Sequence, residues 1–322
     1  LIQEDISELK HLPSCDVIIN FAAESHVDNS IRDTSPFIKS NILGVHNLLE
    51  LVRGKPEYDR PLFFQISTDE VYGDRLEGSF TEEDKLTPSN PYSATKAAAE
   101  MLVLSYYRTF GLEYIITRSA NNYGPRQYEE KLIPKCLSSL QSGKQIPVHG
   151  DGSYVRDWTY VKDNVEALFH IIEAGIKNQT YNIAAENPMT NLEVVDTMLK
   201  WKEKDRRSVK FVDNRWGQDL RYSVSSTKIR KIGWEPQMVL KKIFLTGGSG
   251  TLGTELIKIS KAHDVKFIAP ASKYCDITNP YQIHNYIKAS GDCDTVVHSA
   301  AITDVKATEN DPSRAWEVNV LG

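Results

Sequence analysis

Short apolar runs rich in β-branched residues alternate with longer segments in which apolar side chains recur every three or four positions. The runs at 15–24, 60–68 and 112–124 are typical of buried strands, and the segments 35–53 and 90–111 between them are typical of helices. Strands that are joined by helical crossovers predict a parallel sheet with helices on both faces. We therefore expect a doubly wound α/β fold.

The second of these helices carries clear end signals. Asn90 suits the N-cap, Pro91 suits the first turn, and Gly111 suits the residue after the last turn. After residue 127 the pattern loosens into shorter elements up to about residue 231. We expect these elements to form a smaller substrate lobe that faces the carboxyl edge of the sheet, where ligands bind in such folds.

Another segment in which an apolar run is followed by glycines and a helical pattern lies far along the chain. The segment KKIFLTGGSGTLGTELIK at 241–258 places Gly247, Gly250 and Gly253 between an apolar run and a helical pattern. This order is typical of the phosphate-binding turn of a dinucleotide-binding unit, so the three glycines are predicted cofactor-binding residues. We expect two units, residues 1–240 and residues 241–322, the second being a partial Rossmann unit.

The chain also repeats itself. Residues 16–44 align without gaps with residues 294–322, and nine of the 29 pairs are identical, among them Asn41 with Asn319. Unrelated strand–helix segments resemble one another too, but the shared NxLG ending favours two related units in tandem. On this alignment the first unit lacks a glycine turn of its own, and the second stops before its catalytic helix. One hypothesis is that residues 241–275 dock on the sheet of the first unit and supply that turn.

Composition narrows the possible partners. The net charge is -5 and the pI is about 6.0, so we expect no nucleic acid partner. Apolar runs are far shorter than the roughly 18 residues of a membrane helix, and no secretory signal is visible, which favours a cytoplasmic protein without a membrane partner. The four cysteines are scattered and the eight histidines form no Cys/His cluster. We therefore expect free thiols and no metal site.

Candidate chemistry begins at the end of the second predicted strand. Thr68, Asp69 and Glu70 lie where ligands bind in an open α/β sheet. Neighbouring side chains of an extended chain point to opposite sides, so the two carboxyl groups can address two different substrate atoms. The alternative is a solvated turn after a strand.

A tyrosine and a lysine open the next helix. Tyr92 and Lys96 are four positions apart and therefore share one helix face. An ammonium group near a phenol lowers the phenol pKa from about 10, which makes the tyrosine a suitable base for a hydroxyl group. The YxxxK pattern is common by chance, and its value here is its position directly after the strand that carries the two carboxyl groups.

Six motifs occur in order: NFAAESHVDNSI, STDEVYG, NPYSATKAAAE, RSANNYGPRQ, PVHGDGSYVRDWTYVKD and YNIAAENPMTNLEVV. By these motifs, residues 1–240 resemble the extended short-chain dehydrogenases/reductases, which have a Rossmann-like fold, and among them the nucleotide-sugar 4,6-dehydratases of the dTDP-glucose 4,6-dehydratase kind. Epimerases of this superfamily share YxxxK but usually lack an Asp-Glu pair after the threonine. The resemblance covers nearly all of residues 1–240 and omits roughly the first 50 residues of the family, a span comparable to a βαβ unit.

The resemblance implies a redox cycle with bound NAD. Tyr92, assisted by Lys96, would take the proton of the sugar 4-hydroxyl while hydride moves from C4 to NAD⁺. Glu70 would then remove the C5 proton, Asp69 would protonate the departing 6-hydroxyl, and hydride would return to C6. Thr68 would hydrogen-bond the 4-oxygen. The product would be a 4-keto-6-deoxy sugar nucleotide.

The resemblance also implies contacts around both ligands. Those to the cofactor are Asp5, Ile6, Ala22, Ala23, Ser40, Ser67, Tyr92, Lys96 and Asn122. Those to the nucleotide sugar are Ser25, Thr68, Asn121, Lys131, Leu132, Pro147, Val148, His149, Arg156, Asn191 and Arg215.

Two features of the nucleotide region leave alternatives open. Arg156 suits a diphosphate because a guanidinium group pairs two oxygens at once, and the alternative is a surface salt bridge to Asp157. Trp216 and Gln218 stand where bacterial dTDP-sugar enzymes usually have Pro and His. The nucleotide is therefore dTDP or UDP.

Residues 241–322 resemble the amino-terminal part of a dTDP-4-dehydrorhamnose reductase or a related epimerase/reductase. The matching stretches are KIFLTGGSGTLGTELIK, CDITNP and HSAAITDVKATENDP. The strand VKFIAPASK ends without the acidic residue that binds the 2′-hydroxyl of NAD. Lys273 suits a 2′-phosphate instead, so the cofactor of this unit is NAD or NADP, unless Lys273 is merely solvated.

We therefore predict an NAD-dependent nucleotide-sugar 4,6-dehydratase that is fused to the start of a 4-keto-sugar reductase. Its partner is a nucleoside-diphosphate sugar, and the resemblance implies a homodimer. One alternative is a nucleotide-sugar 4-epimerase with the same fold, which would release no keto sugar. The other is an inactive fragment that keeps only a sugar-nucleotide surface or an assembly role.

Overall fold

The computed structural model describes residues 3–214, 216–237, 241–260, 265–272, 274–289, 293, 295–301 and 305–321. The chain divides into two compact units, Leu1–Gln237 and Met238–Gly322. No helix among the described residues has both the length and the apolar character that crossing a membrane requires.

The first unit is built from nine strands and eight α-helices among the described residues. The strands are β1 (Val17–Asn20), β2 (Leu62–Thr68), β3 (Tyr114–Ser119), β4 (Asn121–Tyr123), β5 (Ile146–His149), β6 (Val155–Tyr160), β7 (Gln179–Ile183), β8 (Pro188–Thr190) and β9 (Val209–Val212). The α-helices are α1 (Val27–Arg32), α2 (Ser35–Phe37), α3 (Gly44–Arg53), α4 (Pro91–Phe110), α5 (Leu132–Gln141), α6 (Val161–Glu173), α7 (Asn191–Trp201) and α8 (Thr227–Arg230). Three 3-10 turns, η2 (Glu57–Asp59), η3 (Asp69–Tyr72) and η4 (Arg206–Ser208), and a π-helix, η1 (Ile38–Leu43), complete it.

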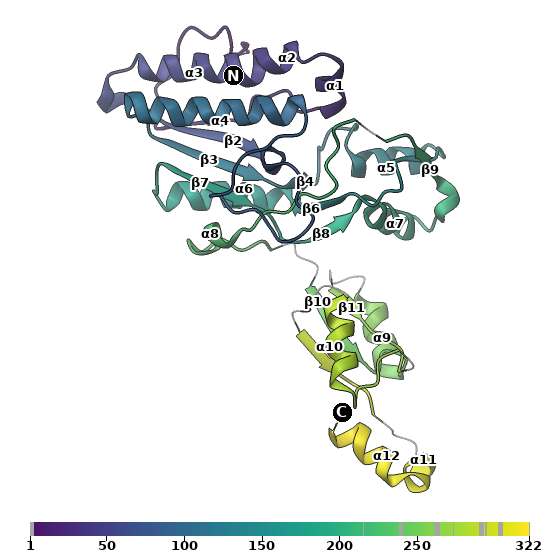
Figure 1. Cartoon of the computed structure of the whole chain (residues 1–322). Coiled ribbons are helices and arrows are strands. Elements are labelled where there is room, and N and C mark those ends of the chain that lie inside the picture. The colour runs from purple at the N-terminus through teal and green to yellow at the C-terminus, as the bar shows by residue number, and fades with distance from the viewer. Residues whose placement is uncertain are drawn as a thin grey trace. The chain divides into compact units, whose positions relative to one another are not determined.

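The main sheet is parallel and has helices on both faces. Its strand order is β1-β2-β3-β7, with α3 and α4 on one face and α6 on the other (Figure 1). Phe63 packs with α3 and α4, whereas its neighbour Phe64 packs with α6 and β7. Successive side chains of a strand point to opposite faces, so a strand covered on both sides has apolar residues on both faces, as Phe63 and Phe64 show. The predicted doubly wound, Rossmann-like fold is confirmed.

Helix α4 begins and ends where its sequence signals predict. The side chain of Asn90 accepts a hydrogen bond from the backbone N–H of Ser93 at 2.9 Å, and Pro91 occupies the first position. The helix ends at Gly111, which has a φ of 70°. These caps satisfy backbone groups that a helix end would otherwise leave without partners. Tyr92, Lys96 and Glu100 lie on the buried side of α4.

A smaller lobe lies beyond the carboxyl ends of β2 and β3 (Figure 1). Strands β5 and β9 pair in parallel, and α5 and α7 pack on them around Cys136, Ile146 and Val195. Strand β6 pairs with β4 on one side and β8 on the other. This lobe therefore brings residues of β5, β6, α5 and α7 over the edge of the main sheet where ligands bind in such folds.

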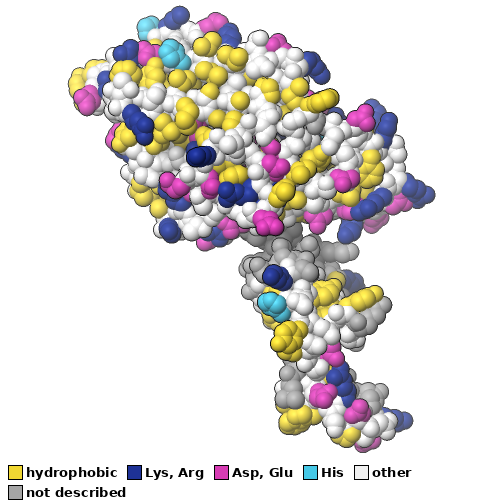
Figure 2. All heavy atoms as spheres, viewed as in Figure 1, with side chains coloured by type: hydrophobic (Ala, Val, Ile, Leu, Met, Phe, Trp, Pro, Cys, Tyr) yellow, Lys and Arg dark blue, Asp and Glu magenta, His cyan; other side chains and the backbone are white. Residues whose placement is uncertain are grey.

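An exposed apolar surface covers the outer side of the first helical layer. Figure 2 shows hydrophobic side chains, in yellow, gathered over α3 and α4. Exposed apolar residues of α4 are Met101, Tyr107 and Phe110, and Ile38 and Leu43 are exposed on the neighbouring η1. A contiguous apolar surface of this kind marks an interaction surface more often than a solvated one.

The second unit is a three-stranded parallel sheet with helices. Its elements are β10 (Lys241–Thr246), α9 (Thr251–Ser260), β11 (Val265–Ile268), α10 (Pro280–Ala289), β12 (Thr295–His298), α11 (Val305–Asn310), α12 (Pro312–Trp316) and the π-helix η5 (Glu317–Leu321). The strand order is β11-β10-β12, so both edges of β10 are paired inside this unit. If residues 241–275 are to complete the sheet of the first unit, one of these pairings must be exchanged.

The glycine turn of the second unit is closely packed. Gly247 follows β10 with a φ of 71°, and a Cβ atom there would lie 2.6 Å from the backbone oxygen of Ser299. A Cβ atom at Gly253 would collide with the backbone oxygen of Gly247. The spacing of the glycines is therefore required by the close approach of strand, turn and helix, as in dinucleotide-binding turns.

The internal repeat of the sequence is a repeat of structure. In the alignment, Val17–Asn20 corresponds to Thr295–His298, which are β1 and β12. Val27–Arg32 corresponds in the same way to Val305–Asn310, which are α1 and α11, and a π-helix ends at Leu43 and at Leu321. A π-helix is rare, so its recurrence at the same aligned position indicates that the two units are related.

The turn after η3 provides the first stability test. Gly73 has a φ of 80°, and a Cβ atom at this position would run into the backbone oxygen of Thr87. Gly78 has a similar φ of 71° but no heavy atom within 4 Å of such a Cβ. We expect Gly73→Ala to lower the free energy of unfolding by roughly 2–4 kcal/mol and Gly78→Ala by about 1 kcal/mol, because only the first adds a collision to the backbone strain. Urea unfolding of the two variants measures the difference, and equal losses would contradict the collision.

Candidate active site

The end of β2 turns the two predicted acidic residues in different directions. Thr68 caps the η3 turn, since its hydroxyl accepts a hydrogen bond from the backbone N–H of Glu70 at 3.3 Å. The prediction that Asp69 and Glu70 alternate along an extended chain is wrong, because a side chain cap at Thr68 starts a 3-10 turn at this point. The turn buries Asp69 against Thr68 and leaves Glu70 on the wall of a cavity.

That cavity lies between the main sheet and the smaller lobe. Nine predicted substrate residues line it together with Glu70: Ser25, Asn121, Lys131, Leu132, Pro147, Val148, His149, Arg156 and Asn191. Thr68 is buried behind the wall, and Arg215 lies outside the described residues. Side chains that are distant in the sequence thus share one hollow with a carboxyl group, which is the usual form of a small-molecule site.

The lining also contains residues that sequence reasoning did not assign: His26, Val27, Asn90, Gln127, Glu130, Lys135, Trp158, Gly217 and Tyr222. Gln218 lines the cavity too, next to the exposed Trp216. Sequence analysis considered the stretch NRWGQDLRY only for its departures from the family. It did not consider Tyr222, whose polar side chain comes four residues after Gln218 in the same stretch.

The environments of the two acidic residues separate their proton affinities. Burial raises the pKa of Asp69 well above its usual value, and the neighbouring charge of Glu70 raises it further. Burial also raises the pKa of Glu70, but the cationic Arg156 and Lys131 oppose that increase. Two carboxyl groups whose pKa values differ in this way suit an acid and a base of one reaction. Burial favours the protonated form of both groups; Arg156 opposes this at Asp69 and at Glu70, and Lys131 opposes it further at Glu70.

Tyr92 and Lys96 lie on the buried side of α4, but they do not interact as predicted. The Nζ atom of Lys96 donates to the backbone oxygen of Ile66 at 2.7 Å. Burial lowers the pKa of Lys96 to about 8, against the opposing charge of Glu100. Burial raises the pKa of Tyr92 well above its usual value, and Glu70 adds to the rise. The prediction that Lys96 lowers the pKa of Tyr92 is therefore wrong for this structure, because desolvation outweighs any attraction from an ammonium group that bonds elsewhere.

Several predicted cofactor residues have unused hydrogen-bonding capacity. Among the described residues, the buried Oγ of Ser67 and Oδ1 of Asn122 have no hydrogen-bond partner. Buried polar atoms without partners are costly, so they suit a polar ligand. Ser40 is half-buried. Ala22 and Ala23 follow β1, and their small side chains leave room for a ligand there. The residues present therefore fit a nicotinamide nucleotide at the carboxyl edge of β1, β2 and β3.

The other predicted cofactor residues have partners of their own. The carboxylate of Asp5 accepts from Ser7 and pairs with Lys39 at 3.1 Å. The side chain of Ile6 packs in the core beside α3, directly over Gly44. The glycines of the turn, Gly247, Gly250 and Gly253, belong to the second unit. Lys273, the predicted 2′-phosphate contact, lies outside the described residues.

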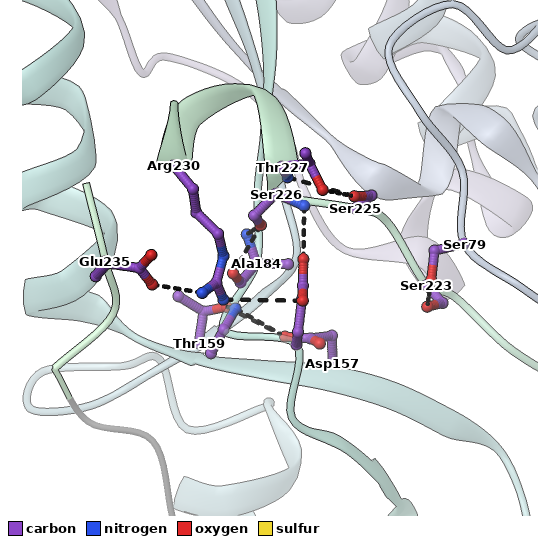
Figure 3. Close-up of polar contacts among 12 residues, drawn as sticks. Ser79, Asp157, Thr159, Ala184, Ser223, Ser225, Ser226, Thr227, Arg230 and Glu235 are labelled. Carbon is purple, nitrogen blue, oxygen red and sulfur yellow. Dashed lines mark hydrogen bonds and ion pairs between the residues drawn. The ribbon is translucent and has the colours of Figure 1, made fainter. Parts of the chain in front are cut away.

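Arg156 and Asp157 bond to different partners rather than to each other. The guanidinium group of Arg156 donates to the backbone oxygens of Val155 and Asp219 at 2.7 and 2.9 Å. The carboxylate of Asp157 accepts from the backbone N–H of Ala185 at 3.1 Å and from Thr159, near the segment that holds α8 (Figure 3). Backbone oxygens carry only partial charge, so Arg156 keeps most of its positive charge available at the cavity wall.

Asp157 makes stability depend on pH. Burial raises its pKa to about 7, against hydrogen bonds from the backbone of Asn187 and Ala185. The folded protein therefore binds a proton that the unfolded chain releases near pH 4, and this contribution is lost as the pH rises through the folded value. Asp157→Asn mimics the protonated form. We expect its free energy of unfolding, relative to that of the wild type, to increase by roughly 2 kcal/mol as the pH rises from about 5 to about 8. Denaturant unfolding at the two pH values measures this gain, and parallel curves would contradict it.

Comparison with known proteins agrees with this geometry. Residues 3–246 match the family model described as GDP-mannose 4,6 dehydratase. Residues 241–322 match the model described as RmlD substrate binding domain. The two matches overlap at residues 241–246, shortly after the boundary between the two compact units.

Individual relatives cover about the same part of the chain. The low-salt glycan biosynthesis protein Agl12 of Haloferax volcanii is 47% identical and covers 69% of this chain and 71% of its own length. The dTDP-glucose 4,6-dehydratase of Neisseria gonorrhoeae is 44% identical and covers 69% of this chain and 70% of its own length. The structure of DesIV, a dTDP-glucose 4,6-dehydratase from Streptomyces venezuelae solved with NAD, has a TM-score of 0.68 at 38% identity and covers 72% of this chain and 71% of its own.

Proposed function

Because the chain belongs to the GDP-mannose 4,6-dehydratase family, we propose that its first unit is an NAD-dependent 4,6-dehydratase of dTDP- or UDP-glucose. The observation that carries this proposal is the pair of acidic residues at the end of β2. Asp69 is buried and burial raises its pKa, while Glu70 faces the cavity beside Arg156 and Lys131. Elimination of water needs both an acid and a base, and this pair supplies them within one turn.

The cofactor would lie at the carboxyl edge of the first three strands. Ser67 and Asn122 have free hydrogen-bonding atoms there, and Tyr92 and Lys96 lie beside them on α4. NAD bound there would supply a hydride acceptor for C4 of the sugar and, once reduced, a hydride donor for C6. Lys96, whose pKa burial lowers to about 8, gains stabilisation when its ammonium group meets the hydroxyl groups of a ribose.

The sugar would be oriented by the polar lining of the cavity. Arg156 offers the diphosphate a cation held in place by backbone oxygens, and Lys131 offers a second charge. Tyr92 takes the proton of the 4-hydroxyl, with Thr68 hydrogen-bonded to its phenol. A phenol that still holds its own proton cannot accept another, so Tyr92 must first release its proton to solvent, and burial makes the resulting phenolate costly.

Elimination then uses the two carboxyl groups in turn. Once C4 is a ketone, the C5–H bond breaks, its proton forms an O–H bond on Glu70, and its electron pair is shared with the 4-oxygen. Asp69 gives its proton to the 6-hydroxyl, which leaves C6 as water. A 4-epimerase removes and returns hydride at C4 alone and needs neither residue, so the acid–base pair favours dehydration over epimerisation.

The proposal extends to the rest of the chain. The second unit would be the start of a 4-keto-sugar reductase with NAD or NADP as cofactor, since it matches the RmlD model and has a closely packed glycine turn. The exposed apolar surface over α3 and α4 would form the interface of a homodimer. The protein would act in the cytoplasm.

Incubating the chain with NAD and either dTDP-glucose or UDP-glucose in deuterated water tests this function. The proposal expects a product that has lost one water molecule and carries deuterium at C5, both visible by mass spectrometry and NMR. A product of unchanged mass with galactose configuration would identify a 4-epimerase instead. No change in either sugar would identify an inactive fragment.

A further inference from the structure

Tyr222 is a buried residue whose hydroxyl lies between two carboxyl groups. Its oxygen is 2.7 Å from Oδ2 of Asp219 and 3.4 Å from Oε2 of Glu70. Tyr222 is 4% exposed and Asp219 is 6% exposed. The steps described for the first unit give neither residue a role, although Tyr222 reaches the base of the elimination.

Asp219 is held firmly in this arrangement. Its Oδ1 accepts from the hydroxyl of Ser89 at 2.6 Å, while its backbone oxygen accepts from Arg156 at 2.9 Å. Both carboxyl oxygens therefore receive a hydroxyl proton, which suits a carboxylate. The guanidinium group of Arg156 also lies 4.1 Å from the ring centre of Tyr222. The phenol of Tyr222 has little freedom to turn.

Counting protons shows what Tyr222 presents to Glu70. A phenol carries a single proton, and the shorter contact places that proton on the Asp219 side. The lone pairs of the phenol oxygen then face Glu70. An ionised Glu70 finds no donor there, whereas a protonated Glu70 can donate its new proton to Tyr222.

We propose that Tyr222, oriented by Asp219, is a positioning residue that accepts a hydrogen bond from Glu70 once Glu70 has taken the C5 proton of the sugar. This inference rests on the proposed function. In the step concerned, the C5–H bond breaks, the proton forms an O–H bond on Glu70, and the electron pair moves into the enolate. The Tyr222–Asp219 pair stabilises the state after this proton transfer, in which Glu70 is protonated.

The other groups around Glu70 have opposing effects on its protonation, so the hydrogen bond to Tyr222 can decide which form of Glu70 prevails. Arg156 and Lys131 favour the ionised carboxylate, as does the side chain of Asn90. The charge of Asp219 favours the protonated form. Tyr92, the remaining neighbour that titrates, is a neutral phenol because burial raises its pKa. Tyr222, as a hydrogen-bond acceptor for protonated Glu70, therefore shifts an equilibrium on which the neighbouring charges have opposing effects.

The first experiment measures the proton affinity of Glu70 without substrate or cofactor. Protein labelled with ¹³C at the glutamate carboxyl groups is titrated by NMR, and the Glu70 signal is assigned by its absence in Glu70→Gln. We expect Tyr222→Phe to lower the titration midpoint of Glu70 by about one pH unit, since the protonated form loses its acceptor. Asp219→Asn is expected to lower it as well, because an amide donates to Tyr222 and frees the phenol proton for an ionised Glu70. Tyr58→Phe, at an exposed tyrosine, is the matched control and leaves the midpoint in place.

An unchanged midpoint in Tyr222→Phe would overturn the proposal. A raised midpoint would overturn it too, since it would show that Tyr222 donates to the ionised base. Because this titration needs no turnover, it decides the role of Tyr222 even if the wild type forms no keto sugar. A wild type that forms no keto sugar would refute the proposed function instead.

A kinetic experiment separates positioning from a merely structural role. Dehydration needs an ionised Glu70, so we expect the acid limb of kcat against pH to move to lower pH in Tyr222→Phe, in step with the titration. We also expect kcat to fall about tenfold with little change in KM, and the isotope effect of deuterium at C5 to increase. A fall in kcat with an unmoved acid limb would show that Tyr222 only supports the fold and would refute the positioning role.

Discussion

Glu70→Gln is expected to lower kcat for the 4-keto-6-deoxy product by about 10² to 10⁴-fold, because an amide cannot accept the C5 proton. Glu70 is the acidic residue on the cavity wall, and Arg156 and Lys131 are the cations that keep a proton-accepting form available. Oxidation at C4 does not use this group. In deuterated water the variant is therefore expected to incorporate no deuterium at C5 of the sugar.

Asp69→Asn distinguishes the acid from the base. Its loss in kcat is expected to be of the same order, roughly 10² to 10⁴-fold, because the 6-hydroxyl then has no proton donor. Glu70 remains in place, so exchange of the C5 proton with solvent deuterium continues. Exchange that is lost in Asp69→Asn and kept in Glu70→Gln would reverse the two roles.

Glu77→Gln is the matched control for the base. It makes the same chemical change seven residues further on, at an exposed side chain in the turn region after η3. We expect its kcat to stay within about twofold of the wild type, since surface substitutions rarely change either stability or activity. A comparable loss in both variants would mean that the substitution disturbs the turn rather than the chemistry.

Arg118→Met is expected to lower the free energy of unfolding of the first unit by about 3–5 kcal/mol, because it leaves a buried carboxylate without its partner. Arg118 on β3 is 4% exposed and Glu100 on α4 is 0% exposed, and their Nη2 and Oε2 atoms are 2.7 Å apart. Arg118 also donates to the hydroxyl of Tyr72 at 2.6 Å. The pair therefore ties α4, which carries Tyr92 and Lys96, to the centre of the sheet.

Two comparisons isolate the buried charge as the cause. Lys177→Met removes one side of a half-exposed ion pair with Glu113 and is expected to cost at most about 1 kcal/mol. The double change Arg118→Met with Glu100→Leu is expected to recover much of the loss, since no unpaired charge remains. Hydrogen exchange of the β3 amides reports the stability of this unit. A double variant as unstable as the single one would show that packing, not charge, is responsible.

Local features of the chain were predictable because they depend on near neighbours. Asn90, Pro91 and Gly111 determine where α4 begins and ends through backbone hydrogen bonds and conformation, and the structure confirms all three. The alternation of apolar runs and amphipathic segments likewise predicts the parallel sheet with its two helical layers. The roles of the site residues stay predictions, although nine of those assigned to the sugar line one cavity.

The errors concern quantities that local sequence does not contain. An extended chain was expected at Asp69 and Glu70, but the hydrogen bond from Glu70 to Thr68 starts a turn. A lowered pKa was expected at Tyr92, but the pKa of a phenol depends on how deeply it is buried. Burial is a property of all the elements that pack around a group, so the YxxxK spacing alone has no access to it.

The sequence by itself determined the two units, their repeat, the class of fold and the identity of the acidic residues at the end of β2, because each of these is written in spacing along the chain. Only the tertiary structure decided that Tyr222 meets Glu70 and that Ser89 meets Asp219. The two members of each pair are more than a hundred positions apart in the sequence, so their contact follows from how distant segments pack together. Proton affinity depends on such contacts and on exclusion of water, so the chemistry of the base is decided by packing.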